Sequence, residues 1–373
     1  ADVFRGEGFD IIIGNPPFIG HHLQTKAQKD SLQKTLHEIQ GAGVLDYVTG
    51  WYIKAAKYIH NTKIKVAFVS TNSISQGEQA AILWNYLIHR FGIKIHFAHR
   101  TFNWSNEAKG NAAVHVVIIG FANFDTTNKS IFDYEDIKGE PHEVKAKNIN
   151  PYLVDAKDIL VENRSTPISN VPKMIWGNKP TDGGNFLFEN EKIKNEFLAK
   201  EPNARPWIKY YMSGDDFIQG KYRFCLWLKD ISPTELKSLP EVRKRVEKVK
   251  NNRLESKAAL TQKKAETPTL FVQISQPDTN YLAIPEVSSE KRKYIPIGFI
   301  DKDVIASNTI QLVPNATLFH FGILTSLMHN VWMKNICGRL ESRLRYSNTI
   351  VYNNYPWPVN QSEKSIRRKT AIS

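Results

Sequence analysis

The sequence of 373 residues has few cysteines, no long apolar run and fewer acidic than basic residues. Its two cysteines, Cys225 and Cys337, lie in separate segments without metal-ligand spacing, which predicts free thiols in a reducing cytoplasm and no metal site. The best apolar run, residues 112–121, is strand-sized and interrupted by His115, so no membrane span is expected. The chain also contains no Gly-x-Gly-x-x-Gly motif for a nucleotide cofactor.

Positive charge is abundant, and so are the residues that build a core. The net charge is +13, with 41% hydrophobic and 11% aromatic residues, which excludes a disordered polypeptide. Residues 1–155 hold 16 Lys and Arg against 15 Asp and Glu, whereas residues 156–373 hold 34 against 22. This distribution predicts that the second part binds a polyanion, and a basic but merely solvated surface is the alternative.

The most informative stretch is the apolar run Phe9–Gly14, which is followed by Asn15, Pro16, Pro17 and Phe18. Because proline cannot donate to a strand ladder, the run predicts a strand that ends at Gly14 or Asn15. The prolines stiffen the chain and leave an amide, unused carbonyls and a ring at the carboxyl end of the strand, where α/β sheets bind ligands. Such a set of groups suits holding a planar amino group between acceptors while a ring stacks on it. A proline-terminated strand that enters an ordinary loop is the alternative.

The order of elements in residues 1–155 predicts an α/β fold. Apolar runs predict strands and 3.6-residue periodicity predicts helices, and residues 122–165 are expected to be a linker or a peripheral β segment. The predicted strands are Phe9–Gly14, Lys65–Ser70, Ile93–Ala98 and Ala113–Phe121, and the predicted helices are Val44–His60 and Gln79–Phe91. A polar loop between the last two strands carries Phe102 and Trp104, and Asp46 lies in the opening turn of the first helix.

From residue 166 onward, short aromatic-rich runs separated by Pro and Gly predict an irregular α/β or mostly β domain. Residues 241–264 contain nine basic residues against three Glu, with valines on one stripe, and residues 318–340 show a second helical pattern. The first stretch predicts a basic amphipathic helix that contacts DNA phosphates, or else a solvated helix face. The predicted DNA contacts are Arg243, Lys244, Arg245, Lys248 and Arg253, together with a second cluster of Lys291, Arg292 and Lys293.

The Asn-Pro-Pro-Phe motif resembles the catalytic motif of amino-group methyltransferases, above all the adenine-specific DNA enzymes. Three further strings, at residues 204–208, 288–296 and 345–358, resemble the target-recognition and C-terminal regions of the MmeI-like restriction-modification enzymes. The resemblance implies the second half of a Rossmann-like class I methyltransferase sheet in residues 1–155. An α+β target-recognition domain in residues 156–315 and a helical C-terminal segment in residues 316–373 would follow it.

By this resemblance the chain is part of a site-specific DNA methyltransferase that flips adenine and methylates its amino group from S-adenosylmethionine. The resemblance implies double-stranded DNA as its partner. The Asn15 side chain and the Pro16 carbonyl would accept hydrogen bonds from the amino group, and Phe18 would stack on the base. The implied residues are Asn15, Pro16, Pro17 and Phe18 for catalysis, Phe102 or Trp104 for a second stacking ring, and Asn15 and Asp46 for the cofactor.

The chain has no initiator Met and no glycine-rich cofactor loop, so it is expected to be an inactive piece of a longer protein. The family carries a nuclease domain ahead of the methyltransferase, which makes an upstream nuclease an expectation. Two alternatives stay open. One is a specificity module that binds DNA without its own chemistry. The other is a methyltransferase acting on a protein glutamine or an RNA amino group, although in the glutamine enzymes the motif lies toward the end of the chain.

Overall fold

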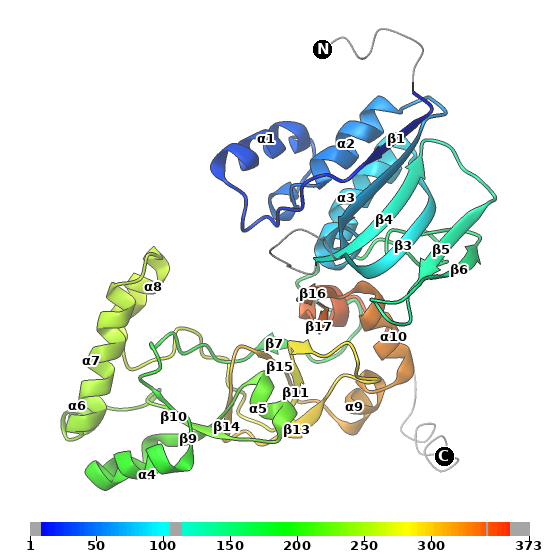
Figure 1. Ribbon diagram of the computed structural model, residues 1–373. Coiled ribbons are helices and arrows are strands. Elements are labelled where there is room, and N and C mark those ends of the chain that lie inside the picture. The colour runs from blue at the N-terminus through cyan, green and yellow to red at the C-terminus, as the bar shows by residue number, and fades with distance from the viewer. Residues whose placement is uncertain (1–8, 105–113, 341, 359–373) are drawn as a thin grey trace, which may run out of the picture. The chain divides into compact units, whose positions relative to one another are not determined.

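The computed structural model describes residues 9–104, 114–340 and 342–358, and its contacts divide the chain into two compact units (Figure 1). Unit 1 comprises Ala1–Ser165, Met333–Leu344 and Thr349–Asn354, and unit 2 comprises Thr166–Trp332, Arg345–Asn348 and Tyr355–Ser373. Residues 316–373, predicted as a segment of their own, are therefore shared between the two units.

Unit 1 is built on a six-stranded sheet with the order β1-β2-β4-β3-β5-β6. Its strands are β1 Ile11–Gly14, β2 Lys65–Thr71, β3 Lys94–Trp104, β4 Val114–Ala122, β5 Lys129–Asp133 and β6 His142–Ala146. Strand β1 is parallel to β2, β3 is parallel to β5, and β4 lies antiparallel between β2 and β3. Strands β1, β2, β3 and β5 therefore end at the same edge of the sheet. This mixed sheet confirms the predicted α/β fold class.

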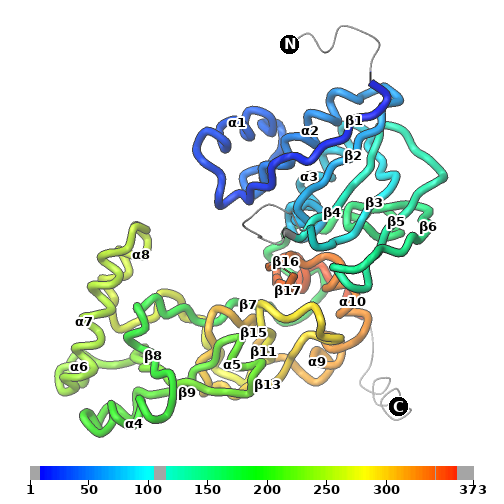
Figure 2. The backbone as a smooth tube through the Cα atoms, viewed as in Figure 1, coloured from blue at the N-terminus to red at the C-terminus, as the bar shows by residue number. Residues whose placement is uncertain are grey.

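Helices α1 Lys26–Leu36, α2 Thr49–Tyr58 and α3 Gly77–Phe91 belong to unit 1, and the chain passes through α1 between β1 and α2 (Figure 2). A cluster of buried rings joins two of these helices to one face of the sheet. Tyr52 of α2 stacks on Phe121 of β4, with ring centroids 5.3 Å apart, and meets Trp84 of α3 edge-on. Tyr52 and Trp84 are completely buried, so this face holds the core of the unit.

The helix predicted over residues 44–60 begins later, at Thr49. A 3-10 turn, Ala42–Val44, precedes it, and Leu45 is extended, with φ −79° and ψ 139°. The backbone N–H of Tyr47 is donated to the Ile19 carbonyl at 2.9 Å instead of to a helical partner. The segment before the helix is therefore held by the loop that follows the Asn-Pro-Pro-Phe motif. Residues 122–165, predicted as a linker or peripheral β segment, contain strand β5 and the edge strand β6.

Unit 2 contains two four-stranded sheets, with the orders β14-β9-β10-β8 and β13-β11-β15-β7. The strands of the first sheet are β8 Leu187–Phe188, β9 Ile208–Met212, β10 Arg223–Leu226 and β14 Val304–Ala306. Those of the second sheet are β7 Ile175–Trp176, β11 Tyr281–Pro285, β13 Gly298–Ile300 and β15 Ile310–Pro314. The remaining short strands of the chain are β12 Val287–Ser288, β16 Gly338–Leu340 and β17 Arg343–Arg345.

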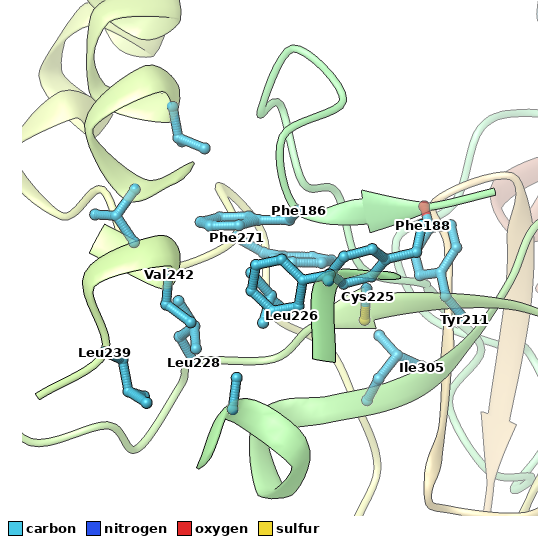
Figure 3. Packing of buried hydrophobic residues seen from close by; sticks show 14 of the residues in the cluster. Phe186, Phe188, Tyr211, Cys225, Leu226, Leu228, Leu239, Val242, Phe271 and Ile305 are labelled. Atoms are coloured by element: carbon cyan, nitrogen blue, oxygen red, sulfur yellow. The ribbon is translucent and has the colours of Figure 1, made fainter. Parts of the chain in front are cut away.

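Seven helices complete the part of the chain that the structure describes. They are α4 Glu191–Lys200, α5 Gly214–Gln219, α6 Pro233–Lys237, α7 Pro240–Leu254, α8 Ala259–Lys263, α9 Leu318–Leu324 and α10 Leu327–Ile336. The predicted valine stripe of α7 is confirmed, because Val242, Val246 and Val249 are buried in the core beside the first sheet. Figure 3 shows this core, in which Leu239 and Val242 lie near Leu228.

Two of the predicted helices are each split in two. The stretch 241–264 breaks after Leu254, where the Ser256 hydroxyl accepts the N–H of Ala258. The stretch 318–340 breaks between α9 and α10, where Thr325 donates its hydroxyl to Phe321 and Ser326 accepts the N–H of His329. In each case short polar side chains bond the backbone locally and compete with the helix. Residues 338–340 form strand β16 rather than helix.

Candidate active site and nucleic-acid interface

The Asn-Pro-Pro-Phe motif lies where the sequence predicted it, at the carboxyl end of β1. Asn15 and Pro17 are exposed, Phe18 is partly buried and Pro16 is buried. Among the described residues, no group donates a hydrogen bond to the side chain of Asn15 or to the carbonyl of Pro16. Two acceptors and a partly exposed ring are therefore available together beside the end of a parallel strand.

Asp46 lies next to this motif but does not have the role predicted for it. Its side chain is buried, with only 6% of the residue exposed. One carboxylate oxygen accepts the backbone N–H of His21 at 3.0 Å and the Gln79 amide at 3.2 Å. The other accepts hydroxyl groups from Ser73 and Thr71. Because both oxygens are occupied by protein donors, the structure contradicts the prediction that Asp46 contacts the cofactor.

Phe102 and Trp104 lie at the end of β3, which is separated from β1 by β4 and β2. The Phe102 ring stacks on Tyr134, just after β5, with centroids 5.0 Å apart and planes 17° apart. The Trp104 ring is tilted against Phe102 at 6.2 Å. No ring contact in the described part of the chain joins either residue to Phe18, so a stacking role for them stays a prediction. The rest of their loop, residues 105–113, lies outside the described residues.

The aromatic group around Phe102 includes a histidine that sequence reasoning overlooked. His99 stacks on Phe132 at 4.3 Å, and its Nδ1 lies 2.8 Å from the Tyr134 hydroxyl. Burial lowers the pKa of His99, so the imidazole is neutral near pH 7. The cluster fixes the ends of β3 and β5 on the side away from β1.

Helix α7 divides its basic residues between solvent and core. Arg243, Lys244 and Lys248 are exposed, and Lys244 pairs with Glu241 at 2.7 Å. Arg245 is partly buried: it donates to the Asn185 carbonyl at 2.6 Å and lies over the rings of two phenylalanines. This position is contrary to the prediction that Arg245 contacts phosphate, because its guanidinium belongs to the packing of unit 2.

The position of Arg253 contradicts the prediction that this residue contacts DNA phosphates. It is completely buried, and the carbonyl groups around it accept all five of its N–H donors. These carbonyls, 2.7–3.2 Å from the guanidinium nitrogens, belong to Pro180, Thr181, Lys264, Thr267 and Leu270. Arg253 therefore cannot contact a DNA phosphate, and it ties two loops to the end of α7.

The second basic cluster lies in a turn between β12 and β13. Lys291, Arg292 and Lys293 are all exposed there, and the Lys293 ammonium lies 5.5 Å from the centre of the Tyr294 ring. The backbone N–H of Arg292 is donated to the Ser289 carbonyl at 3.2 Å. An exposed basic turn next to a half-exposed aromatic ring is compatible with contact to DNA, and this role stays a prediction.

Unit 1 also holds a basic cavity that the sequence did not reveal. Its volume is about 180 Å³, and its walls carry Arg100, Lys334 and Arg339 against one carboxylate, that of Asp133. Arg100 pairs with Asp133 at 3.1 Å and reaches Asn335 at 3.5 Å. More than 230 residues separate Arg100 from Asn335 in the chain, so no local pattern brings them together.

Two family models match the chain. The model "MmeI, DNA-methyltransferase domain" matches residues 6–133, and the model "MmeI, target recognition domain" matches residues 155–359, which is more than half of the chain. The chain belongs to the MmeI family. This confirms the resemblance that the Asn-Pro-Pro-Phe motif and the three C-terminal strings indicated.

Two similar proteins agree with this assignment. The chain is 42% identical over 363 residues to DNA methyltransferase A of Bacillus subtilis (strain 168), which covers 97% of this chain and 40% of that protein. A solved structure of the Type IIL restriction-modification enzyme MmeI in complex with DNA matches with a TM-score of 0.90 and 51% identity. That match covers 96% of this chain and 47% of the other, so the chain spans less than half the length of both relatives.

Within the described ranges, no helix is long and apolar enough to cross a membrane.

Proposed function

We propose that the natural polypeptide containing these residues methylates the exocyclic amino group of adenine in duplex DNA. In this proposal unit 1 of the chain contributes the catalytic motif, and residues 155–359 read the DNA. The observation that carries the proposal is the Asn-Pro-Pro-Phe motif at the carboxyl end of β1, where its two acceptors have no hydrogen-bond donor among the described residues. Membership of the MmeI family and the DNA complex of a 51% identical relative support it.

The proposed chemistry follows from the hydrogen bonds that these two oxygens can accept. An exocyclic amino group has two hydrogens in the plane of the base, and the Asn15 side-chain oxygen and the Pro16 carbonyl would each accept one. Both hydrogen bonds increase electron density on the nitrogen and turn its lone pair away from the ring. Phe18 would stack on the extruded base, a contact of about 1–3 kcal/mol. The two prolines hold these groups in place before the base arrives, so little reorganisation is needed.

The cofactor implied by the family is S-adenosylmethionine, which carries a methyl group on a positively charged sulfur. The described residues fit only the part of such a molecule that lies beside the reacting nitrogen. In this proposal Asn15 and Phe18 lie beside that position, whereas the Asp46 carboxylate is buried and bound by protein donors. Strand β1 is the edge strand of the described sheet, and Ile11 and Ile13, which share one face of it, are 61% and 78% exposed. In this chain the cofactor would therefore meet an open sheet edge rather than a complete pocket.

The DNA-binding part of the proposal rests on charge and exposure. Residues 156–373 carry nearly all of the excess positive charge, and α7 presents Arg243, Lys244 and Lys248 to solvent. Phosphate contacts of this kind give affinity without sequence preference. Base reading needs side chains that reach the grooves, for which the turn with Lys291 and Arg292 is the candidate.

The test is the variant Asn15→Ala in the natural polypeptide, with Asn203→Ala, an exposed asparagine of unit 2, as the matched control. Loss of one acceptor that acts in the transition state should reduce methyl transfer by about 10²–10³-fold. DNA affinity in a gel-shift assay should change little, because Asn15 acts on a base that is already bound. Methyl transfer is followed with tritiated cofactor, and hydrolysis of the product should give N6-methyladenine.

Four outcomes would count against the proposal. Near-normal methylation by Asn15→Ala would mean that the motif takes no part in methyl transfer. A labelled cytosine instead of adenine would overturn the adenine specificity. DNA binding without any methylation by the unaltered polypeptide would favour the specificity module, and label in protein would favour a glutamine methyltransferase.

A further inference from the structure

Four segments of unit 1 meet at the buried carboxylate of Asp46. The first is the loop after the motif, which donates the His21 backbone N–H to Oδ1 at 3.0 Å. The second is the end of β2 and the turn that follows it, where the hydroxyl groups of Thr71 and Ser73 face Oδ2. The third is α3, whose Gln79 amide donates to Oδ1 at 3.2 Å. The fourth is the segment that carries Asp46 itself, just before α2.

Three further contacts lie beside these hydrogen bonds. Gln79 also accepts the backbone N–H of Asp46 at 3.0 Å, so the two side chains bind reciprocally. The His21 ring lies 3.8 Å from the same carboxylate oxygen. Ser73 donates its hydrogen to Oδ2, and the single hydroxyl hydrogen of Thr71 is shared between Oδ2 at 3.4 Å and the Ser73 oxygen at 2.9 Å. The carboxylate is therefore surrounded by protein donors, and the Asp46 residue is 6% exposed.

The loop after the motif is fastened to the same place by two further contacts. The Ile19 carbonyl accepts the backbone N–H of Tyr47 at 2.9 Å. The buried Gln24 amide bridges the Ile19 and Leu45 carbonyls, at 3.4 and 3.1 Å. Ile19 follows Phe18 directly, so these contacts set where the chain goes when it leaves the motif.

We propose that Asp46 is a positioning residue for the Asn-Pro-Pro-Phe motif. By joining the loop at His21 to the ends of β2 and the start of α3, its carboxylate fixes the exit of the motif relative to the sheet edge. The entrance is fixed separately, by the pairing of β1 with β2. With both ends held, the acceptors of Asn15 and Pro16 and the Phe18 ring keep one arrangement. This inference rests on the proposed methyltransferase function and adds a residue that does not touch the base.

Hydrogen-bond chemistry separates this role from direct contact with the cofactor. Serine and threonine hydroxyls accept as well as donate, so an asparagine at position 46 keeps all four partners: its oxygen faces His21 and Gln79, and its amide faces Thr71 and Ser73. Alanine keeps none of them. A positioning role therefore tolerates Asp46→Asn and not Asp46→Ala, whereas a role that needs the negative charge tolerates neither.

The first experiment measures the loop directly, in the 373-residue chain without cofactor or DNA. Hydrogen exchange of peptides covering residues 17–24 should become faster in Asp46→Ala and should stay near the unaltered rate in Asp46→Asn. Peptides from α7, in the other unit, serve as the internal control. Equal exchange of residues 17–24 in all three chains would overturn the proposal.

The second experiment measures kinetics in the natural polypeptide. Asp46→Ala should lower kcat for methyl transfer by about 10²-fold, the effect of a misplaced catalytic group, with KM for the cofactor within about two-fold. Ser73→Ala, which removes only one donor, should have a smaller effect of the same kind. It keeps the test informative if Asp46→Ala does not fold.

The outcomes also separate this inference from the proposed function. If Asn15→Ala is inactive while Asp46→Ala keeps full kcat, the function stands and the positioning role is wrong. If Asp46→Asn and Asp46→Ala both raise KM for the cofactor while Ser73→Ala has no effect, Asp46 is a cofactor ligand instead. If Asn15→Ala keeps full activity, the proposed function itself fails.

Discussion

At the scale of single residues, Arg243 and Arg253 of helix α7 show that burial decides whether a guanidinium faces solvent or binds carbonyl groups of the protein itself. Arg243 is exposed, whereas Arg253 is completely buried and donates to five carbonyl groups. Burial lowers the pKa of Arg253, but an arginine remains charged in proteins. The five hydrogen bonds replace the water that the guanidinium loses, and removing them would leave buried carbonyls without donors.

A buried histidine in unit 2 makes the stability of the chain depend on pH. His329 is completely buried, its Nε2 lies 3.1 Å from the Tyr346 hydroxyl, and burial lowers its pKa to about 4. An unfolded histidine titrates near ~6.5. Between these values only the unfolded chain binds the proton, so the free energy of unfolding should fall as the pH is lowered from about 6.5 to about 4.

The expected loss over this pH window is about 3 kcal/mol, and it should be absent from His329→Gln. Urea unfolding of both chains at several pH values measures the difference. The carboxylates that titrate in the same range are common to both chains and cancel in the comparison. Parallel pH profiles would mean that His329 does not contribute.

At the scale of elements, the exposed face of α7 should govern the salt dependence of DNA binding. Each phosphate that a lysine or arginine neutralises contributes about 0.9 to the slope of log affinity against log salt. Replacing Arg243 and Lys248 by glutamine should therefore flatten the slope by about two units and weaken all sequences alike. Fluorescence anisotropy between about 50 and 300 mM salt measures this.

Two comparisons make the α7 result specific. Lys192→Gln with Lys200→Gln removes the same charge from exposed positions of α4, in the same unit. Arg245→Gln should lower stability rather than change the slope, since Arg245 packs over Phe188 and Phe197. An unaltered slope after the Arg243 and Lys248 changes would mean that α7 is only a solvated face.

Elements with a strong periodic pattern were predicted well from the sequence. Strands β1, β2 and β4 and helix α3 lie within two residues of their predicted bounds, because a continuous apolar run marks each strand and a 3.6-residue stripe marks the helix. The misplaced bounds have a local cause. Around residues 45–48, 255–258 and 325–326, side chains or loops bond the backbone and displace helical partners.

At the scale of the whole molecule, the position of the Asn-Pro-Pro-Phe motif was predictable and the contacts around Asp46 were not. Asn15–Phe18 is a continuous string whose proline chemistry fixes its geometry. Asp46, by contrast, meets Ser73 and Gln79 from 27 and 33 residues away, and Arg253 meets Pro180 from 73 residues away. Such pairings depend on how strands and loops are brought together, which a single sequence does not encode locally. For the same reason, the sequence did not predict the cavity lined by Arg100 and Asn335.

The last prediction concerns the chain as it stands, without any further segment. Its sequence has no glycine-rich cofactor loop, the described sheet ends at β1, and the Asp46 carboxylate is buried and bound by protein donors. The 373-residue chain should therefore bind duplex DNA through its basic unit but bind S-adenosylmethionine weakly or not at all. Calorimetric titration of the chain, with the natural polypeptide as the positive control, measures this. Micromolar cofactor binding by the chain alone would contradict it and would mean that Asn15–Phe18 and its neighbours form a complete pocket.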